Sequence, residues 1–393
     1  MPGPDSRTEH RAASRAARAA NEIARINAFF PIMPLLGNRW AARRPFEGMT
    51  LGVSAHLTTL TAALVREMGL GGGTIALCGA SAATTDPAVV DLLRDEGHHV
   101  YTTGSREDHH DLVLDHEPEL LADVGADLIG FACTHRPEAS RRVLGAVEVT
   151  KSGVNRLPQL ELRFPVVNIN DGRLKSSIEN RHGVGEGLWH ALQRLTGIHL
   201  SGRRVAVVGY GPVGKGVAFY ARSHGAVVEV VETDSVRRLC AHYDGFPTPS
   251  LAACIARTGI LVTCTGLRHT LPVEMLGEAR EGLVIINAGH GGDEVDVAGI
   301  KASAESVDQI ADHVVSYQLE GGPRVLLLAD GHPLNIVMNA GSPEPVLLHF
   351  ALLGLTMEWL TRNPLPPGEH IVPATMEREA AELALEALSM AHG

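Results

Sequence analysis

Short apolar runs alternate with longer amphipathic segments along most of the chain from residue 49 onward. Runs of this length, bounded by glycine and polar residues, are typical of strands buried on both faces of a parallel sheet. Strands that alternate with helices predict a doubly wound α/β domain. In the first half we expect strands at 50–54, 74–78, 100–102, 128–133 and 166–169, and helices at 58–68 and 87–96.

The second half has the same alternation. A long helix is expected at 184–196, before the first strand of this half. The turn at 320–323 contains Gly-Gly-Pro and joins two neighbouring strands. The expected strands are 205–208, 227–231, 260–263, 283–287, 314–318 and 325–329, and the expected helices are 213–224, 346–360 and 377–390.

A glycine-rich turn separates strand 205–208 from the helix after it. Gly209, Gly211 and Gly214 fit the pattern G-x-G-x-x-G. The first glycine permits a tight turn, the second lets a pyrophosphate approach the backbone, and the third lets the helix pack close to the strand. Glu232 ends the next strand, where a carboxylate binds the adenosine ribose of NAD and repels the extra phosphate of NADP. These features predict an NAD-binding Rossmann domain.

This turn admits two other interpretations. Residues 209–215 also fit the start of a P-loop, but Gly216 follows where a Ser or Thr hydroxyl would bind magnesium, so this interpretation is rejected. A Rossmann-like unit that has lost its ligand stays open. Because the last helices are expected to return to the first half, we predict a discontinuous substrate-binding domain at 1–180 and 340–393. The Rossmann domain, at 181–339, is inserted into it.

Composition narrows the functional classes. The 393 residues are 45% hydrophobic and carry a net charge of -11, without the basic stripe of a duplex nucleic-acid binder. No apolar run approaches the roughly 20 residues that span a membrane. The five cysteines are scattered and form no C-x-x-C pair, which is typical of a reduced, cytoplasmic protein. We predict no metal site.

A few polar residues stand where sites form. His56 follows a strand, His290 follows another, and Lys175, Glu179 and Asn180 lie in the segment between the two halves. Lys175 and Glu179 are four residues apart and would share one face of a helix. A surface ion pair and structural histidines are the plainer interpretations. The location at strand ends and between domains favours a site, because clefts form there.

Segments of the chain resemble motifs of the S-adenosyl-L-homocysteine hydrolase family from about residue 45 to 360. The segment 168–183 is similar to V-N-D-x-x-x-K-S-K-x-D-N-x-x-G, and 207–216 is similar to A-G-Y-G-x-V-G-K-G. Shorter similarities are 56–58 to H-M-T, 232–234 to E-x-D, 265–266 to T-T-G and 287–290 to N-x-G-H.

The resemblance implies a reaction. Tightly held NAD oxidises the 3′-hydroxyl of a nucleoside, the ketone acidifies the C4′ hydrogen, the 5′ substituent leaves, and the ketone is reduced again. By position, Lys175 and Glu179 would bind the 3′-hydroxyl and move its proton. His56 and His290 would flank C5′ as acid and base, and Thr58 would approach the nucleoside.

The resemblance also implies partners for the chain. It favours a homodimer or homotetramer and a nucleoside substrate.

The resemblance implies a set of cofactor-binding residues as well. Asn180, which is also a predicted catalytic residue, would contact the nicotinamide side. The implied cofactor-binding residues are Thr150, Ser152, Asn180, Gly209, Gly211, Val213, Gly214, Glu232, Thr265 and Asn335.

The chain departs from the family pattern at several positions. Glu179 replaces an aspartate, and Leu60 stands where the family has a glutamate that reads adenine. The acidic D-D-G-G stretch is expected to be absent, with 131–134 in its place, and Val149 replaces the second glutamate of E-E-T-T-T-G. Ser342 replaces the histidine of G-H-P. We find no counterpart of the family's Lys/Tyr tail.

Three hypotheses follow from what is kept and what is changed. The preferred one is a nucleoside dehydratase that does not add water back, of the kind that would turn angustmycin C into angustmycin A in antibiotic biosynthesis. The second is an authentic adenosylhomocysteinase with an altered pocket. The third is a catalytically silent, NAD-binding regulatory protein.

Overall fold

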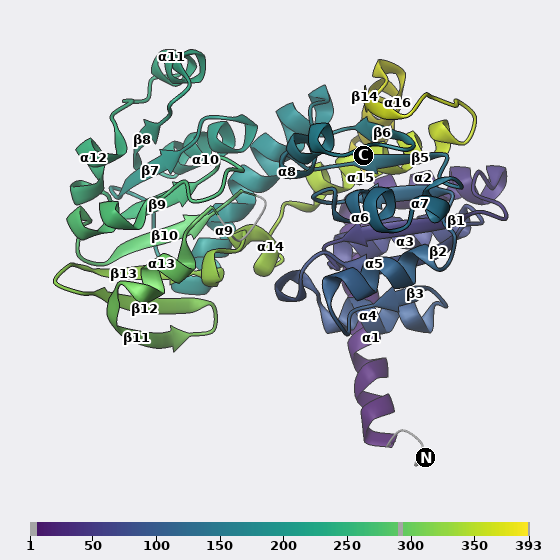
Figure 1. Cartoon of the computed structure of the whole chain (residues 1–393), viewed down its shortest axis with the longest axis horizontal. Coiled ribbons are helices and arrows are strands. Elements are labelled where there is room, and N and C mark those ends of the chain that lie inside the picture. The colour runs from purple at the N-terminus through teal and green to yellow at the C-terminus, as the bar shows by residue number, and fades with distance from the viewer. Residues whose placement is uncertain (1–5, 290–293, 392–393) are drawn as a thin grey trace. The chain divides into compact units, whose positions relative to one another are not determined.

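The computed structural model describes residues 6–289 and 294–391 and is shown in Figure 1. Contacts divide the chain into two compact units. Unit 1 comprises Met1–Lys175 and Pro343–Gly393, and unit 2 comprises Ser176–Ser342. The sequence predicts domain limits at 180/181 and 339/340, and these limits stay a prediction. Each unit is an α/β structure built on one seven-stranded sheet, which confirms the predicted fold class.

The sheet of unit 1 has the order β14-β6-β5-β4-β1-β2-β3, and all its neighbouring strands are parallel. The chain runs outward from β1 to β3 on one side and then crosses to β4 on the other. The switch point of this sheet therefore lies between β1 and β4. The strands are β1 (Thr50–Ala55), β2 (Thr74–Gly79), β3 (His99–Tyr101), β4 (Leu120–Asp123), β5 (Gly145–Glu148), β6 (Pro165–Asn168) and β14 (Gly368–Ile371).

The helices of unit 1 have local sequence signals at their ends. Thr58 caps α3 by accepting a hydrogen bond from the Thr61 amide, Pro87 occupies the first turn of α4, and Ser105 and Asp108 form a capping box on α5. The helices are α1 (Ser6–Phe29), α2 (Ile32–Arg43), α3 (Thr59–Leu70), α4 (Pro87–Asp95), α5 (Arg106–Leu114), α6 (Asp127–His135), α7 (Pro137–Ser140), α8 (Lys151–Arg156), α15 (Pro343–Leu360) and α16 (Ala374–Ala391).

The strand predicted at 128–133 is wrong, because these residues form α6. The strand of this region is β4, eight residues earlier, and β5 and β14 were not predicted. Leu128, Ile129 and Ala132 are buried at helical spacing in the core beneath the sheet. A short apolar run cannot be assigned to a strand or a helix by periodicity alone, and here tertiary packing decides.

The sheet of unit 2 has the order β11-β12-β13-β10-β9-β7-β8. The five neighbouring strands β13, β10, β9, β7 and β8 are parallel to one another, and β12 and β11 pair antiparallel at the β13 edge. The switch point lies between β7 and β9. The strands are β7 (Arg204–Val208), β8 (Val227–Val231), β9 (Ile260–Thr263), β10 (Leu283–Asn287), β11 (Ala304–Ala311), β12 (Val314–Leu319) and β13 (Arg324–Leu328).

Close packing of two helices explains the glycine that ruled out a P-loop. A Cβ on Gly216, in α10, would lie 1.8 Å from the Arg181 carbonyl oxygen, and a Cβ on Gly185, in α9, would lie 2.6 Å from the Gly216 backbone. Gly216 is therefore a packing residue. The helices of unit 2 are α9 (Val184–Thr196), α10 (Pro212–Ser223), α11 (Ser235–Tyr243), α12 (Leu251–Cys254), α13 (Val297–Ala302) and α14 (Leu334–Val337). None of the helices in the described ranges is long and apolar enough to cross a membrane.

Candidate functional site

The glycine turn of unit 2 has the geometry that a dinucleotide requires. Gly209 follows β7 with a φ of 99°, which favours glycine. A Cβ on Gly214 would lie 1.9 Å from the Gly209 carbonyl oxygen, so the first turn of α10 can approach β7 only without a side chain. A Cβ on Gly211 would meet nothing within 4 Å. The second glycine therefore leaves open space at the start of the helix, where a pyrophosphate can approach the amides.

Glu232 lies beside this turn. One carboxylate oxygen accepts a hydrogen bond from the Tyr210 amide at 2.7 Å, and the other accepts from the Thr233 amide at 2.8 Å and the Asp234 amide at 2.9 Å. The acid therefore stands against the middle of the glycine fingerprint, at the end of β8. This is the position from which a carboxylate binds a ribose diol.

Thr265 lies across the switch point, after β9. A Cβ on Gly209 would meet its side chain at 2.9 Å, so the two turns are adjacent. The buried Glu294 holds this turn, because its carboxylate accepts from the Thr265 amide at 2.9 Å and from the Gly266 amide at 2.6 Å. Burial raises the pKa of Glu294. A Cβ on Gly289 would lie 1.5 Å from this carboxylate, so the glycine makes room for it. Sequence reasoning missed Glu294, which belongs to no motif.

Two further cofactor candidates lie in unit 2. Val213 is in the first turn of α10, next to the glycine turn. Asn335 is buried on α14, and within the described part of the chain its side-chain oxygen has no hydrogen-bond partner. A buried amide oxygen without a partner is costly and fits a polar ligand atom. Unit 2 thus fits NAD by its open glycine turn, its ribose-side acid and its buried amide.

The segment with Lys175 and Glu179 forms a π-helix, Lys175–Gly183, where the sequence suggested an ordinary helix. Stretches of π-helix are rare and frequently occur at functional sites. Lys175 is 7% exposed and Glu179 is 5% exposed, so neither is a solvated surface residue. Asn180 lies in the same π-helix. Lys175 is in unit 1 and Glu179 is in unit 2. A buried amine and a buried carboxylate can each bind and release a proton.

His349, on α15 of unit 1, was not singled out from the sequence. Its burial and the positive charge of Lys175 hold the pKa of His349 well below its usual range. Among the residues that the structure describes, neither of its ring nitrogens has a hydrogen-bond partner. A neutral imidazole therefore accompanies Lys175 in unit 1. No sequence signal marks this histidine, which sits within an apolar helix.

The residues predicted to approach the nucleoside follow β1. The His56 ring nitrogen Nδ1 is 2.7 Å from the Thr84 hydroxyl oxygen, and the Thr61 hydroxyl donates to the His56 carbonyl at 2.6 Å. Thr58 is the cap of α3. His56 and Thr58 are thus held beside the switch point of unit 1. His290 lies outside the described residues.

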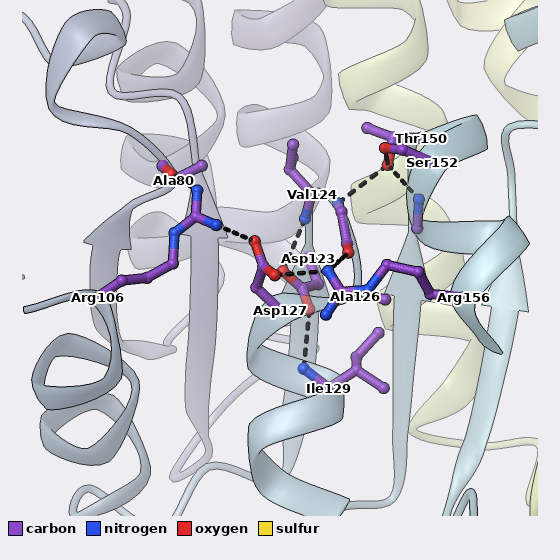
Figure 2. Close-up of polar contacts among 12 residues, drawn as sticks. Ala80, Arg106, Asp123, Val124, Ala126, Asp127, Ile129, Thr150, Ser152 and Arg156 are labelled. Carbon is purple, nitrogen blue, oxygen red and sulfur yellow. Dashed lines mark hydrogen bonds and ion pairs between the residues drawn. The ribbon is translucent and has the colours of Figure 1, made fainter. Parts of the chain in front are cut away.

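Two buried carboxyl groups, Asp123 and Glu148, accept hydrogen bonds on the opposite side of this switch point, and Asp123 is labelled in Figure 2. Asp123, 1% exposed, accepts from the Val124 and Ile129 amides, each at 2.8 Å. Glu148, fully buried, accepts from the Ala126 amide at 2.8 Å and from the Thr150 hydroxyl at 2.6 Å. Burial raises the pKa of both acids, and the charge of Asp123 adds to the rise at Glu148.

Thr150 and Ser152, predicted to contact NAD, belong to this network. The Ser152 hydroxyl donates to the Thr150 hydroxyl oxygen at 3.2 Å, and Thr150 caps α8. Nearby, Asp127 makes ion pairs with Arg106 at 2.8 Å and with Arg156 at 2.5 Å. Figure 2 shows these polar groups gathered at the strand ends.

The expected location of the missing acidic stretch has to be corrected. Residues 131–134 lie inside α6 and do not follow a strand. The segment that follows β4 is Val124-Gly125-Ala126, preceded by Asp123 at the end of the strand. An aspartate is therefore present at this strand end, and a valine comes next.

The protein is a two-domain, NAD-binding α/β protein. This class is defined by the glycine fingerprint and the ribose-side acid of unit 2, together with the second doubly wound sheet in unit 1. Residues 180–341 match the family described as S-adenosyl-L-homocysteine hydrolase, NAD binding domain. The chain is 36% identical to the S-inosyl-L-homocysteine hydrolase of Methanopyrus kandleri, over 91% of this chain and 88% of that protein. It is 33% identical to the adenosylhomocysteinase of Saccharolobus solfataricus, over 96% of this chain and 93% of that protein. The chain belongs to the S-adenosyl-L-homocysteine hydrolase family, and its cofactor is NAD.

One solved structure supports the fold alone. A dipicolinate synthase chain from Bacillus halodurans is similar with a TM-score of 0.51 and 15% identity, covering 81% of this chain and all of that one.

Proposed function

We propose that the protein is a redox-neutral, NAD-dependent enzyme that eliminates the 5′ substituent of a purine nucleoside. The observation that carries this proposal is that one chain has both a complete dinucleotide turn and a π-helix with a buried lysine and a buried glutamate. The turn is Gly209, Gly211 and Gly214 with Glu232, and the buried pair is Lys175 and Glu179.

Bound NAD would supply reversible hydride removal at C3′ of the sugar. Lys175 and Glu179 would bind the 3′-hydroxyl and take and return its proton. With C3′ at the carbonyl level, the C4′–H bond is weakened, and its proton passes to a protein base. The bond between C5′ and the leaving group then breaks with its electron pair, and a C4′=C5′ double bond forms. His56 and His290 would exchange protons with the leaving group and with water.

The first candidate for the overall reaction is hydrolysis of an S-nucleosyl-L-homocysteine. The activities by which the relatives are named support it, since they include hydrolases of S-inosyl-L-homocysteine and adenosylhomocysteinases. Leu60 is buried at the start of α3, where the family pattern has the glutamate that reads adenine. A leucine has no hydrogen bond to offer a base, which supports a purine other than adenine.

The second candidate is dehydration of a hydroxymethyl nucleoside to an exocyclic alkene, as in nucleoside-antibiotic biosynthesis. It is favoured by Val124 and Val149, which follow β4 and β5 where the family pattern has acids. A silent regulatory role is the third candidate. It predicts that Lys175→Ala leaves the biological role intact. We also propose a cytoplasmic homodimer or homotetramer, which light scattering would size.

One experiment separates these candidates. NAD-loaded protein is incubated in deuterated water with S-adenosyl-L-homocysteine, S-inosyl-L-homocysteine and the hydroxymethyl nucleoside. Release of a thiol supports hydrolysis, and loss of one water from the nucleoside mass supports dehydration. Deuterium at C4′ supports the shared elimination. Absence of exchange with all three substrates would reject the proposal.

A further inference from the structure

The end of the π-helix lies directly against the helix that follows the glycine turn. A Cβ on Gly216 of α10 would lie 1.8 Å from the Arg181 carbonyl oxygen, so the two backbones are in contact. Gly214, two residues earlier in α10, packs equally closely on the Gly209 carbonyl oxygen. One short stretch of α10 therefore touches both the glycine turn and the π-helix. All these residues belong to unit 2.

Two pairs of side chains extend this contact along α10. The His182 ring nitrogen Nδ1 is 2.9 Å from the Tyr220 hydroxyl oxygen, and the two rings meet edge to face with their centres 5.9 Å apart. The Arg181 guanidinium lies 5.9 Å from the centre of the Phe219 ring, within the range of a cation–π contact. A hydrogen bond is directional, so the His182–Tyr220 pair fixes how the end of the π-helix is turned against α10.

The His182–Tyr220 pair is uncharged at neutral pH. Burial and the positive charge of Arg181 lower the pKa of His182, and burial raises the pKa of Tyr220. Because neither partner is charged, salt does not screen the contact. Neither side chain has a part in the proposed reaction itself. Its effect on function therefore has to come from the contact between the two helices.

This contact holds the part of the π-helix that would act on the ligands. Glu179 and Asn180 precede His182 in the same π-helix. Because a π-helix is a rare conformation, the structure around it has to keep it in place. The first turn of α10 is where a pyrophosphate would meet the backbone amides. The contact thus joins the segment that would move the 3′-hydroxyl proton to the helix that would hold the cofactor.

We propose that His182 and Tyr220 are positioning residues of this site. Their hydrogen bond sets Glu179 and Asn180 against the NAD that α10 binds, and NAD binding in turn orders the π-helix. The effect on catalysis rests on the elimination proposed above, whereas the coupling to NAD is independent of any substrate. A displacement of about 1 Å at a reacting centre can cost about 10²-fold in rate, so a small loss of register is enough to be measured.

The first test measures the order of the π-helix by hydrogen–deuterium exchange. The full-length protein is examined free of nucleotide and again after NAD is added. In the wild type, NAD should slow the exchange of amides in 176–183. Tyr220→Phe keeps the ring and removes the hydroxyl, so we expect it to bind NAD and keep its melting temperature but to lose most of this protection. Tyr243→Phe, on an exposed tyrosine of α11, is the matched control and should behave as the wild type.

The second test separates positioning from folding. Deuterium exchange at C4′ is measured with the candidate substrate that supports it. In Tyr220→Phe we expect kcat for this exchange to fall about tenfold or more, with KM and NAD content unchanged. His182→Phe removes the same hydrogen bond from the other side, so the double variant should fall no further than either single variant. His182→Asn places a polar atom near the position of Nδ1 and should recover part of the rate lost in His182→Phe.

The outcomes that contradict the proposal are distinct from those that contradict the elimination. NAD-induced protection of 176–183 that persists in Tyr220→Phe would overturn the positioning role. So would losses of the two single variants that add up in the double variant, or a fall in kcat that follows loss of bound NAD. Absence of C4′ exchange in the wild type would overturn the elimination instead, and the protection measurement would still decide whether the His182–Tyr220 pair couples NAD to the π-helix.

Discussion

Both units have a switch point at the carboxyl ends of their parallel strands, but the turns there expose bare backbone in unit 2 and side chains in unit 1. In unit 2 the turn after β7 is made of glycines, and its function depends on backbone that no side chain covers. In unit 1 the turns after β1, β4 and β5 carry side chains, namely His56, Val124 and Val149. A dinucleotide is bound mainly through its phosphates, which backbone amides recognise. A substrate that undergoes a reaction needs side chains that bind it and transfer protons, and single substitutions can change these side chains one at a time.

A shared device underlies this difference. Each unit fixes its strand-end turns with a buried glutamate that is seated against a glycine. Glu294 holds the turn after β9, and Gly289 makes room for it. Glu148 joins the turns after β4 and β5, and a Cβ on Gly153 would lie 2.3 Å from its carboxylate. Rigidity therefore comes from the same arrangement in both units, and specificity comes from what the turns present.

The largest expected effect is in unit 2. Gly214→Ala would place a Cβ 1.9 Å from a backbone oxygen, so the turn has to open, and we expect no NAD to remain bound after gel filtration. Gly211→Ala meets nothing within 4 Å, so its melting temperature should be kept while NAD affinity falls. Gly277→Ala, also in open space, is the control. If Gly214→Ala retained NAD, the backbone account of this switch point would be wrong.

The next effect concerns Lys175. Lys175→Met keeps the length of the side chain and removes the amine, and we expect deuterium exchange at C4′ to fall about 10²–10⁴-fold, as for loss of a proton-transfer group. NAD content should be unchanged, because unit 2 supplies the glycine turn. Lys301→Met, on an exposed lysine of α13, is the control. Exchange at the wild-type rate in Lys175→Met would assign the proton chemistry to other residues.

Sequence could predict the parts of both units whose signals are local. The strand, glycine turn and helix of 204–223 follow from glycine spacing and a continuous apolar run, and the structure confirms them. The prediction for 128–133 is wrong because apolar residues on a buried helix look like a strand at short length. That error placed the strand end at 133 and not at Asp123, ten residues too far along the chain, and so hid this aspartate.

The buried acids could not be predicted for a different reason. Glu148 accepts from the Ala126 amide, 22 residues before it, and Glu294 accepts from the Thr265 amide, 29 residues before it. Their partners are backbone groups, which every residue has, so no residue type in the sequence marks the contact.

A moderate effect is expected from the acid pair of unit 1. Burial raises the folded-state pKa of Asp123 and Glu148 above the unfolded values, so the folded protein holds their protons longer. Their contribution to stability is therefore full at acidic pH and is lost as pH rises through the raised pKa values. The free energy of unfolding, measured with urea from the pH of an ordinary carboxyl pKa up to that of the raised pKa values, should fall as the pH rises.

Glu148→Gln tests the assignment. The amide keeps one acceptor and loses the hydrogen bond from Ala126, so we expect a cost of about 1–3 kcal/mol and a shallower dependence of stability on pH. Glu117→Gln, on an exposed acid that pairs with Arg142, should change neither quantity. An unchanged pH slope in Glu148→Gln would mean that other groups set the titration.

The smallest effect is expected at the charged rim of unit 1, by which we mean Arg106, Asp127 and Arg156. Arg106 is half-exposed and pairs with Asp127 at 2.8 Å, and Arg156 pairs with the same carboxylate, so one partner remains when the other is removed. Arg106→Gln should therefore cost less than about 1 kcal/mol and should matter less at high salt. The informative measurement is KM against kcat for each candidate substrate. A rise in KM for the homocysteine thioether alone would mean that the rim binds its carboxylate, and the side chains of unit 1 would then select the leaving group as well as the sugar.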